Sequence, residues 1–182
     1  MAAFISAHTF LIGQIFGFAA MATAIAMYQF KKHRTIMLLM LLCSALWCAH
    51  FAFLGSATGV VMNVINVARA LVYTQRDKKW GAKPWIPAVF IAASVVTVIF
   101  TWDGVWSLLP CAASVCATLG NWQTDTQKLR LYTVGVCAGW FFYNLIQHSW
   151  AGMANEIFTL FSVAIALWRY HFHPPGEPER PE

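Results

Sequence analysis

Apolar residues fill seven long stretches of the chain, and short polar segments separate them. A helix that crosses the hydrocarbon core of a bilayer needs roughly 20 mostly apolar residues. The stretches are close to that length. The pattern therefore predicts an all-α integral membrane protein with seven transmembrane helices, at 10–29, 35–54, 58–75, 84–101, 105–121, 128–147 and 151–170.

The basic residues predict which way the chain crosses the membrane. Cytoplasmic loops of membrane proteins carry an excess of Lys and Arg. Of the 12 Lys and Arg residues, all except Arg69 follow the first, third or fifth stretch or lie near the C-terminus. The segments 55–57, 102–104 and 148–150 carry none. We therefore expect the N-terminus outside and the C-terminus in the cytoplasm.

The composition agrees with a membrane protein, excludes a disordered chain and strongly disfavours a soluble globule. The 182 residues are 59% apolar and only 10% charged, whereas soluble domains average about 25% charged residues. Disordered chains are polar and highly charged, so that class is excluded. The net charge of +5 is attributed to membrane orientation, and we expect a lipid bilayer rather than a nucleic acid as partner. The first residues lack a basic segment, so we expect no cleavable signal peptide.

The sequence lacks the motifs of enzymes and cofactor-binding proteins. All five cysteines lie in apolar stretches, with no Cys-x-x-Cys pair and no zinc-binding spacing. There is no nucleotide-binding motif and no catalytic triad or pair of carboxylates. We therefore expect no enzyme activity, no metal site and no cofactor.

The sequence also matches itself when it is shifted by 93 residues. This shift places Trp47 on Trp140 and Gly59 on Gly152 without a gap. Three apolar stretches repeat in the same order, and one stretch separates the repeats, so both repeats enter the membrane from the same side. We expect a first three-helix repeat at 1–77, a cytoplasmic loop and linker helix at 78–103, a second three-helix repeat at 104–173, and a disordered polar tail at 174–182.

This order of three, one and three helices resembles the SWEET/PQ-loop (MtN3-like) superfamily of facilitative transporters. More narrowly, His50–Gly55, Asn66–Arg69 and Trp150–Gly152, with Glu156 after the last, are similar to segments of the YgjV family of bacterial inner-membrane proteins. The resemblance extends over nearly the whole chain. It implies a multi-pass protein of the bacterial inner membrane, transport of a sugar or another small solute, and a central site lined by the third helix of each repeat.

Few polar side chains lie inside the predicted helices, and they predict the site. Arg69 is the only basic residue and Glu156 the only acidic residue well inside a stretch. A charge in hydrocarbon costs at least ~2.5 kcal/mol, so such residues are functional by default. The 93-residue shift pairs Asn63 with Glu156 and Asn66 with Thr159. We expect Asn63, Asn66 and Glu156 to bind a polar solute, with Glu156 also a candidate proton carrier. In the alternative, Arg69 and Glu156 form a structural ion pair, or Arg69 extends toward the cytoplasmic face.

Three histidines, His8, His50 and His148, lie near the outer ends of predicted helices. Histidines on helices can ligate haem or a metal, but a lone His at a helix end is more often hydrogen bonded. His50 belongs to the family-like segment and is a candidate to support the solute site. A haem or redox protein built on these histidines remains the less favoured alternative.

Trp47 and Trp140 differ from the other tryptophans because they lie within helices rather than at their ends. They are candidate aromatic walls of a solute site, and core packing is the alternative. Gln14, Asn144 and Gln147 are weaker candidates of the same kind, because hydrogen bonds between helices account for them adequately.

Together these features predict a transporter of a small polar solute, such as a sugar or sugar acid, that works by alternating access around a site at the membrane midplane. The second alternative is a scaffold or partner subunit of the inner membrane that transports nothing. An oligomer is compatible with either function.

Overall fold

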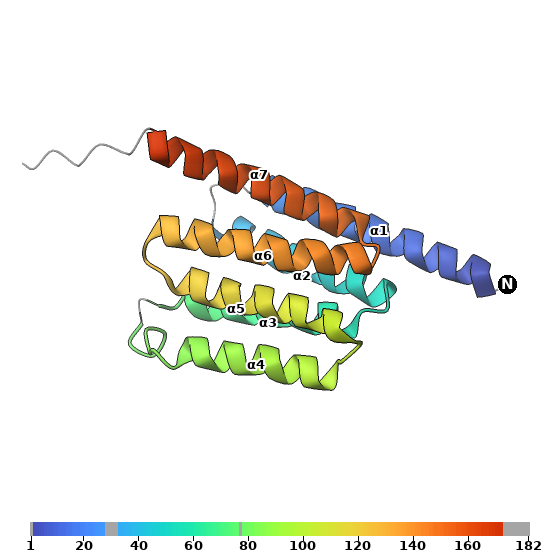
Figure 1. The fold of residues 1–182 in the computed structure, drawn as a ribbon, viewed down its shortest axis with the longest axis horizontal. Helices are drawn as coiled ribbons and strands as arrows, with labels where there is room; N and C mark the ends of the chain where they lie inside the picture. Colours follow the sequence, from blue (N-terminus) through green and yellow to red (C-terminus); the bar gives the residue numbers. More distant parts are fainter. Residues whose placement is uncertain (1, 28–32, 77, 173–182) are drawn as a thin grey trace, which may run out of the picture.

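The computed structural model describes residues 2–27, 33–76 and 78–172, and all regular structure in these ranges is helical (Figure 1). The polar tail predicted at 174–182 lies outside them. The elements are α1 (Ala2–Met27), α2 (His33–Phe53), α3 (Ala57–Tyr73), α4 (Ile86–Phe100), the short 3₁₀ helix η1 (Val105–Ser107), α5 (Leu108–Trp122), α6 (Thr126–Ile146) and α7 (Trp150–Phe172).

The prediction of an all-helical chain with seven long helices is confirmed for the described residues. Each of the seven predicted stretches coincides with one α-helix. The start of the fifth stretch differs, because η1 precedes α5 there. Gly104 has a φ of +92°, which breaks the chain direction before η1. Pro110 lies in the first turn of α5, where no helix hydrogen bond is lost.

The helices form two layers that lie face to face (Figure 1). One layer holds α1, α2 and α3, and the other holds α5, α6 and α7. At one edge α3 contacts α5, and α4 packs against both. At the other edge α1 contacts α7. Helices α2 and α6 are therefore the central members of their layers.

Gly17 allows the close approach at the α1 edge. A Cβ atom on Gly17 would lie 2.6 Å from the Cβ of Ala151 and 2.7 Å from Nδ1 of His50. Small residues commonly permit such contacts between helices in membranes. The absence of a side chain on Gly17 thus lets α1 lie against both α2 and α7.

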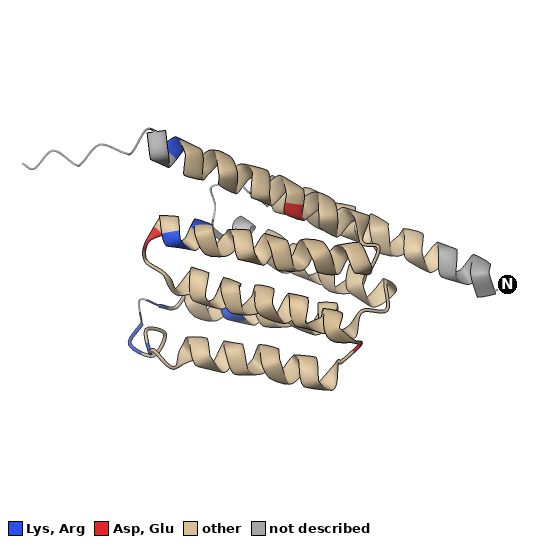
Figure 2. Ribbon diagram, in the orientation of Figure 1, with Lys and Arg blue, Asp and Glu red and all other residues tan. Residues whose placement is uncertain are grey.

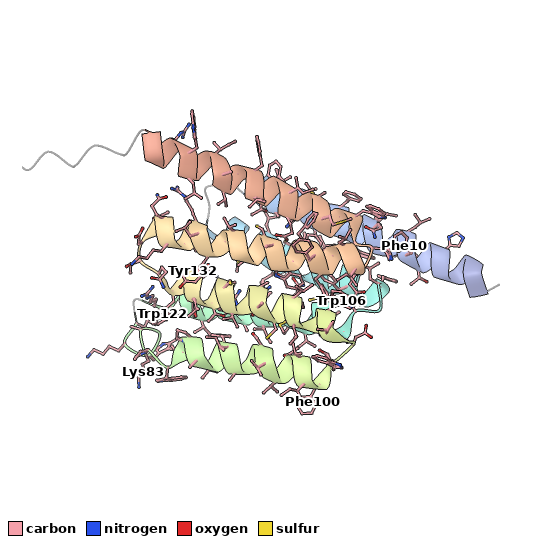
Figure 3. All side chains as sticks on the ribbon, viewed as in Figure 1. Phe10, Lys83, Phe100, Trp106, Trp122 and Tyr132 are labelled. Carbon is pink, nitrogen blue, oxygen red and sulfur yellow. The ribbon has the colours of Figure 1, made fainter. Side chains whose placement is uncertain are left out.

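The exterior of the bundle is apolar, and its interior holds many small polar side chains. Phe100 is 84% exposed and points away from α4 (Figure 3). Ser94, Ser114 and Thr118 are fully buried and hydrogen bonded to neighbouring helices or to their own helix. Polar groups in a bilayer must be satisfied within the protein, so this distribution is typical of a membrane protein.

Helix lengths agree with a membrane protein, although not all helices are equally long. By length and apolar composition, α1 and α7 can each cross a membrane, over His8–Ala26 and Trp150–Arg169. The apolar parts of three further helices are shorter, at Leu38–Phe53, Ala57–Tyr73 and Ile86–Phe100.

Basic residues gather at one end of the bundle (Figure 2). This end holds the α3–α4 loop with Lys83, the start of α6 and the end of α7. Of the described Lys and Arg side chains, Arg69 of α3 alone is buried. Asp103 lies in the loop at the opposite end, between α4 and η1.

Candidate functional site

A cavity of about 260 Å³ lies between the two layers, where α2, α3, α6 and α7 meet. Its lining combines aromatic rings, amide side chains and one carboxylate. Five of the seven residues predicted for the site line it: Trp47, Asn63, Asn66, Trp140 and Glu156. The other lining residues are Phe51, Thr133, Val136, Cys137, Asn144, Asn155 and Thr159.

Helix α3 contributes two amides whose orientations are fixed by their partners. Nδ2 of Asn63 donates to the carbonyl oxygen of Gly59 at 2.9 Å. Oδ1 of Asn66 accepts from Nη2 of Arg69 at 2.9 Å. A carbonyl only accepts and a guanidinium only donates, so neither amide can be reversed. Asn63 therefore keeps its carbonyl oxygen as an acceptor, and Asn66 keeps its NH₂ group as a donor.

Helix α7 places its polar side chains on the same cavity. Nδ2 of Asn155 donates to Oε1 of Glu156 at 3.1 Å. Thr159 lies three residues further along the helix and also lines the cavity. The carboxylate of Glu156 retains further acceptor capacity beside its bond to Asn155. The two polar pairs that the 93-residue shift relates therefore face one space.

Aromatic rings from α2 and α6 form one side of the cavity. The ring centroids of Trp47 and Phe51 lie 6.2 Å apart, and those of Phe51 and Trp140 lie 5.7 Å apart. We call these three residues the aromatic wall. Phe51 and Trp140 also belong to the buried core, so the wall is held by packing as well as facing the cavity.

Arg69 does not line the cavity. It is 4% exposed, and its Nη1 donates to the carbonyl oxygen of Ser114 at 3.1 Å and to Oγ1 of Thr118 at 3.0 Å, both on α5. Within the described ranges, no ion pair joins Arg69 to Glu156, so the predicted alternative of a direct pair is wrong for this structure. The guanidinium turns toward α5 instead of extending to the end of the bundle, because hydroxyl and carbonyl oxygens there satisfy it. Its Nε atom is buried without a hydrogen-bond partner.

His50 is also outside the cavity, and it joins three helices. The side chain is fully buried, with Nδ1 2.7 Å from the carbonyl oxygen of Gly13 and Nε2 2.7 Å from Oγ of Ser149. The carbonyl requires a proton on Nδ1, so in the neutral ring Nε2 accepts from the Ser149 hydroxyl. Both ring nitrogens are therefore engaged, and a metal or haem at His50 would have to displace one of these bonds.

A metal centre finds no support elsewhere in the part of the chain that the structure describes. No group of three or more His, Cys, Asp and Glu side chains there is arranged to hold a metal ion.

A second hydrogen bond repeats the His50 contact in the other half of the chain. The hydroxyl of Tyr143 is hydrogen bonded to Oγ of Ser56. Tyr143 follows His50 by 93 residues, and Ser149 follows Ser56 by 93 residues. We call these four residues the serine clasp. Each bond joins a central helix of one layer to the start of an outer helix of the other layer, beyond the cavity.

The turns that carry the two serines have the same backbone hydrogen bonds. The amide of Ser56 donates to the carbonyl of Phe51 at 2.9 Å, and the amide of Ser149 donates to the carbonyl of Asn144 at 2.8 Å. The preceding residues both have positive φ angles, +74° at Gly55 and +53° at His148. The 93-residue correspondence therefore extends to backbone conformation.

Sequence reasoning missed several lining residues on α6. Asn144 was only a weaker candidate, explained by bonds between helices, yet its side chain is 2% exposed and its Oδ1 has no hydrogen-bond partner among the described residues. The 93-residue shift could not select Asn144, because its counterpart is the apolar Phe51. Helical spacing from Trp140 could have done so, since residues four apart share a helix face. The same face carries Thr133, Cys137, Trp140 and Asn144.

Comparison with known proteins gives one result. The sequence model of the Imp-YgjV family, described as bacterial inner membrane protein, matches residues 11–173. Neither a protein of curated function nor a solved structure matches the chain significantly. The family match covers most of the chain and reaches into all seven helices, so this chain belongs to the Imp-YgjV family of bacterial inner membrane proteins.

Proposed function

We propose that this inner membrane protein transports a small polar solute by alternating access, with the cavity between α2, α3, α6 and α7 as the solute site. The observation that carries the proposal is a polar cavity inside a bundle with an apolar exterior. Polar groups without partners are costly in hydrocarbon, so a protein retains them mainly where they act on a solute.

The proposal includes the topology of the chain. Seven spans form two parallel three-helix repeats, joined by α4, in the manner of the SWEET/PQ-loop superfamily. The serine clasp and the matching turns at Gly55 and His148 support this arrangement. The N-terminus lies outside and the C-terminus in the cytoplasm, in agreement with basic residues at one end of the bundle.

In this mechanism the serine clasp closes the outer end of the transport path. The clasp lies at the end of the bundle opposite the basic residues. On α3 the first lining residue, Asn63, follows Ser56 by seven residues, which is about 10 Å along the helix. On α2 and α6 the lining residues Phe51 and Asn144 directly follow the clasp residues His50 and Tyr143. Separation of the two layers at the clasp opens the cavity to the outside. When the clasp re-forms, the layers separate at the opposite end, and the solute leaves toward the inner side.

Retention of solutes by proteoliposomes tests the proposal. Vesicles with purified full-length protein are incubated with a mixture of sugars, sugar acids, polyols, amino acids and small amines, and the retained compounds are identified by mass spectrometry. We expect at least one compound to accumulate above protein-free vesicles. The double substitution Asn66→Ala and Glu156→Gln should remove the difference.

Two other outcomes would contradict the proposal. The first is equal retention by vesicles with and without folded protein across the mixture, which favours the scaffold or partner-subunit function. The second is a retained compound whose uptake is unchanged by both substitutions, which would place transport elsewhere. A cooperative thermal unfolding transition in detergent must show that the double variant is folded.

A further inference from the structure

We infer that the solute held by the cavity carries an ammonium group, bound between the Glu156 carboxylate and the aromatic wall. This inference rests on the proposed function and adds the chemical class of the solute. It differs from the sugar or sugar acid that the sequence analysis predicts, because neither compound brings a positive charge to the site.

The charge of the lining favours a positive group. Glu156 is the only ionisable carboxyl among the twelve lining residues, and none of the twelve is Lys, Arg or His. Its bond from Asn155 comes from a neutral amide. In the described ranges no basic side chain pairs with Glu156. A carboxylate away from water requires either a proton or a counter-ion, and an ammonium group on the solute provides the second.

The remaining acceptors match the donors of an ammonium group. Asn63 keeps its Oδ1 as an acceptor because its NH₂ is bonded to Gly59, and the Glu156 carboxylate has acceptor capacity beyond its bond from Asn155; both residues line the cavity. A buried acceptor that stays unbonded costs about 1–3 kcal/mol. An R–NH₃⁺ group has three N–H donors, so it can satisfy acceptors of this kind and remain close to a carboxylate.

The aromatic wall adds a second source of attraction for a cation. Ring faces carry negative electrostatic potential, and a cation within about 6 Å of a ring centroid is stabilised, most strongly by Trp. Two of the three wall residues are tryptophans. A neutral polyol can also pack on such rings, but it leaves the charge of Glu156 without a partner.

Arg69 brings a positive charge beside the cavity, because it is bonded to the lining residue Asn66. Its guanidinium lies behind Asn66 and points toward Ser114 and Thr118. This position keeps it outside the lining, and it polarises the NH₂ of Asn66 as a donor. A carboxylate on the same solute would therefore be favoured near Asn66, so simple amines and amino acids are both tested.

The cavity volume limits the solute to a small molecule. At about 260 Å³ it lies just below the ~300–1,000 Å³ range of typical ligand pockets. Compounds of four to six carbons are therefore suitable probes.

Matched pairs of compounds isolate the contribution of the ammonium group. Binding to the full-length protein in detergent is measured by calorimetry for butylammonium against 1-butanol, and for norleucine against hexanoate. D-glucose serves as the neutral polyol. We expect at least one ammonium compound to bind tenfold or more tightly than its partner and than D-glucose. Butylammonium and norleucine distinguish a simple amine from an amino acid.

Substitutions at Glu156 complete the test. Glu156→Gln preserves the shape of the side chain and should weaken ammonium binding at least tenfold, whereas Glu156→Asp should retain most of it. A cooperative thermal unfolding transition without ligand shows whether each variant is folded. If a variant is not folded, the comparison of paired compounds on the wild-type protein still decides the test. Equal binding within both pairs, tighter binding of D-glucose, or no binding of any ammonium compound overturns the inference. Binding of D-glucose alone would do so while the proposed transport function stands.

Discussion

At the scale of single residues, the backbone at His148 is the clearest departure from ordinary geometry. Its φ of +53° is uncommon for a residue with a side chain. The equivalent turn has Gly55, with a φ of +74° and open space where a Cβ would lie. The two positions therefore share a left-handed backbone conformation, which glycine adopts without strain and histidine does not.

This difference predicts opposite effects of two substitutions. Gly55→His should lower the free energy of unfolding in detergent by about 1 kcal/mol, because a Cβ disfavours the left-handed region. His148→Gly should leave stability unchanged or raise it slightly, since strain is removed but the unfolded chain gains freedom. Chemical unfolding followed by fluorescence measures both. Equal losses in the two variants would show that side-chain contacts, not backbone strain, decide stability here.

Arg69 presents a different problem at the same scale, because it is a buried charge with no carboxylate partner among the described residues. Its two terminal nitrogens bind groups on two helices, α5 and its own helix α3. A planar guanidinium can reach several acceptors at once, and a lysine ammonium cannot do so with the same geometry.

We therefore expect Arg69→Lys to lower the free energy of unfolding by about 1–3 kcal/mol. It should also weaken solute binding, because the NH₂ of Asn66 would no longer be held toward the cavity. Arg169→Lys, an exposed position on α7, is the matched control and should change neither property. Unaltered stability and binding in Arg69→Lys would contradict the positioning role of Arg69.

At the scale of helices, the serine clasp connects elements that are distant in sequence. The side chain of Tyr143 joins α6 to the residue that caps α3, and His50 joins α2 to the residue before α7. Ser56 accepts from the amide of Gly59, and Ser149 accepts from the amide of Gly152. Each serine thus satisfies its own helix start while it bonds to the opposite layer.

Tyr143→Phe removes one of these bonds and keeps the ring. We expect it to lower the free energy of unfolding by about 1 kcal/mol, the usual net value of a buried hydrogen bond. The double variant with Ser56→Ala should lose less than the sum of the two single losses, because they share one interaction. Tyr132→Phe is the control, since no hydrogen bond to its hydroxyl is observed among the described residues. Additive losses in the double variant would show that the bond contributes nothing.

At the scale of the whole molecule, the charge distribution over the two layers predicts the direction in which the chain crosses the membrane. The central helices α2 and α6 face each other through the aromatic wall, and α4 covers only the α3 and α5 edge. Basic residues lie at the end where α4 and α6 begin. This arrangement agrees with a protein that inserts in a single orientation.

Reporter fusions test that orientation. Green fluorescent protein fused after the C-terminus should fluoresce, because it folds in the cytoplasm. Alkaline phosphatase fused within 102–104 should be active, because this loop is expected outside. A fluorescent C-terminal fusion combined with an inactive phosphatase at 102–104 would contradict the expectation that α4 crosses the membrane outward. If the N-terminus were found in the cytoplasm, a cytoplasmic C-terminus would require an even number of spans. A C-terminus outside would mean seven spans in the reverse orientation.

The sequence by itself determined the helices and the rarest polar positions. Backbone groups in hydrocarbon must bond within their own helix, so apolar stretches specify helices with little help from distant contacts. The cost of polar groups in such stretches made Asn63, Asn66 and Glu156 conspicuous, and all three line the cavity. The 93-residue shift paired residues that face the same space, because equivalent helices were compared at the same depth.

Only the tertiary structure decided which way each side chain faces. Sequence spacing gives the angle of a residue around its helix, but the neighbour on that side depends on how the layers pack. Arg69 therefore turned out to face α5 instead of Glu156, and His50 to hold the serine clasp outside the cavity. Asn144 stayed a weaker candidate for the same reason, since its unpaired oxygen is buried where α6 packs closely against Gly152 of α7.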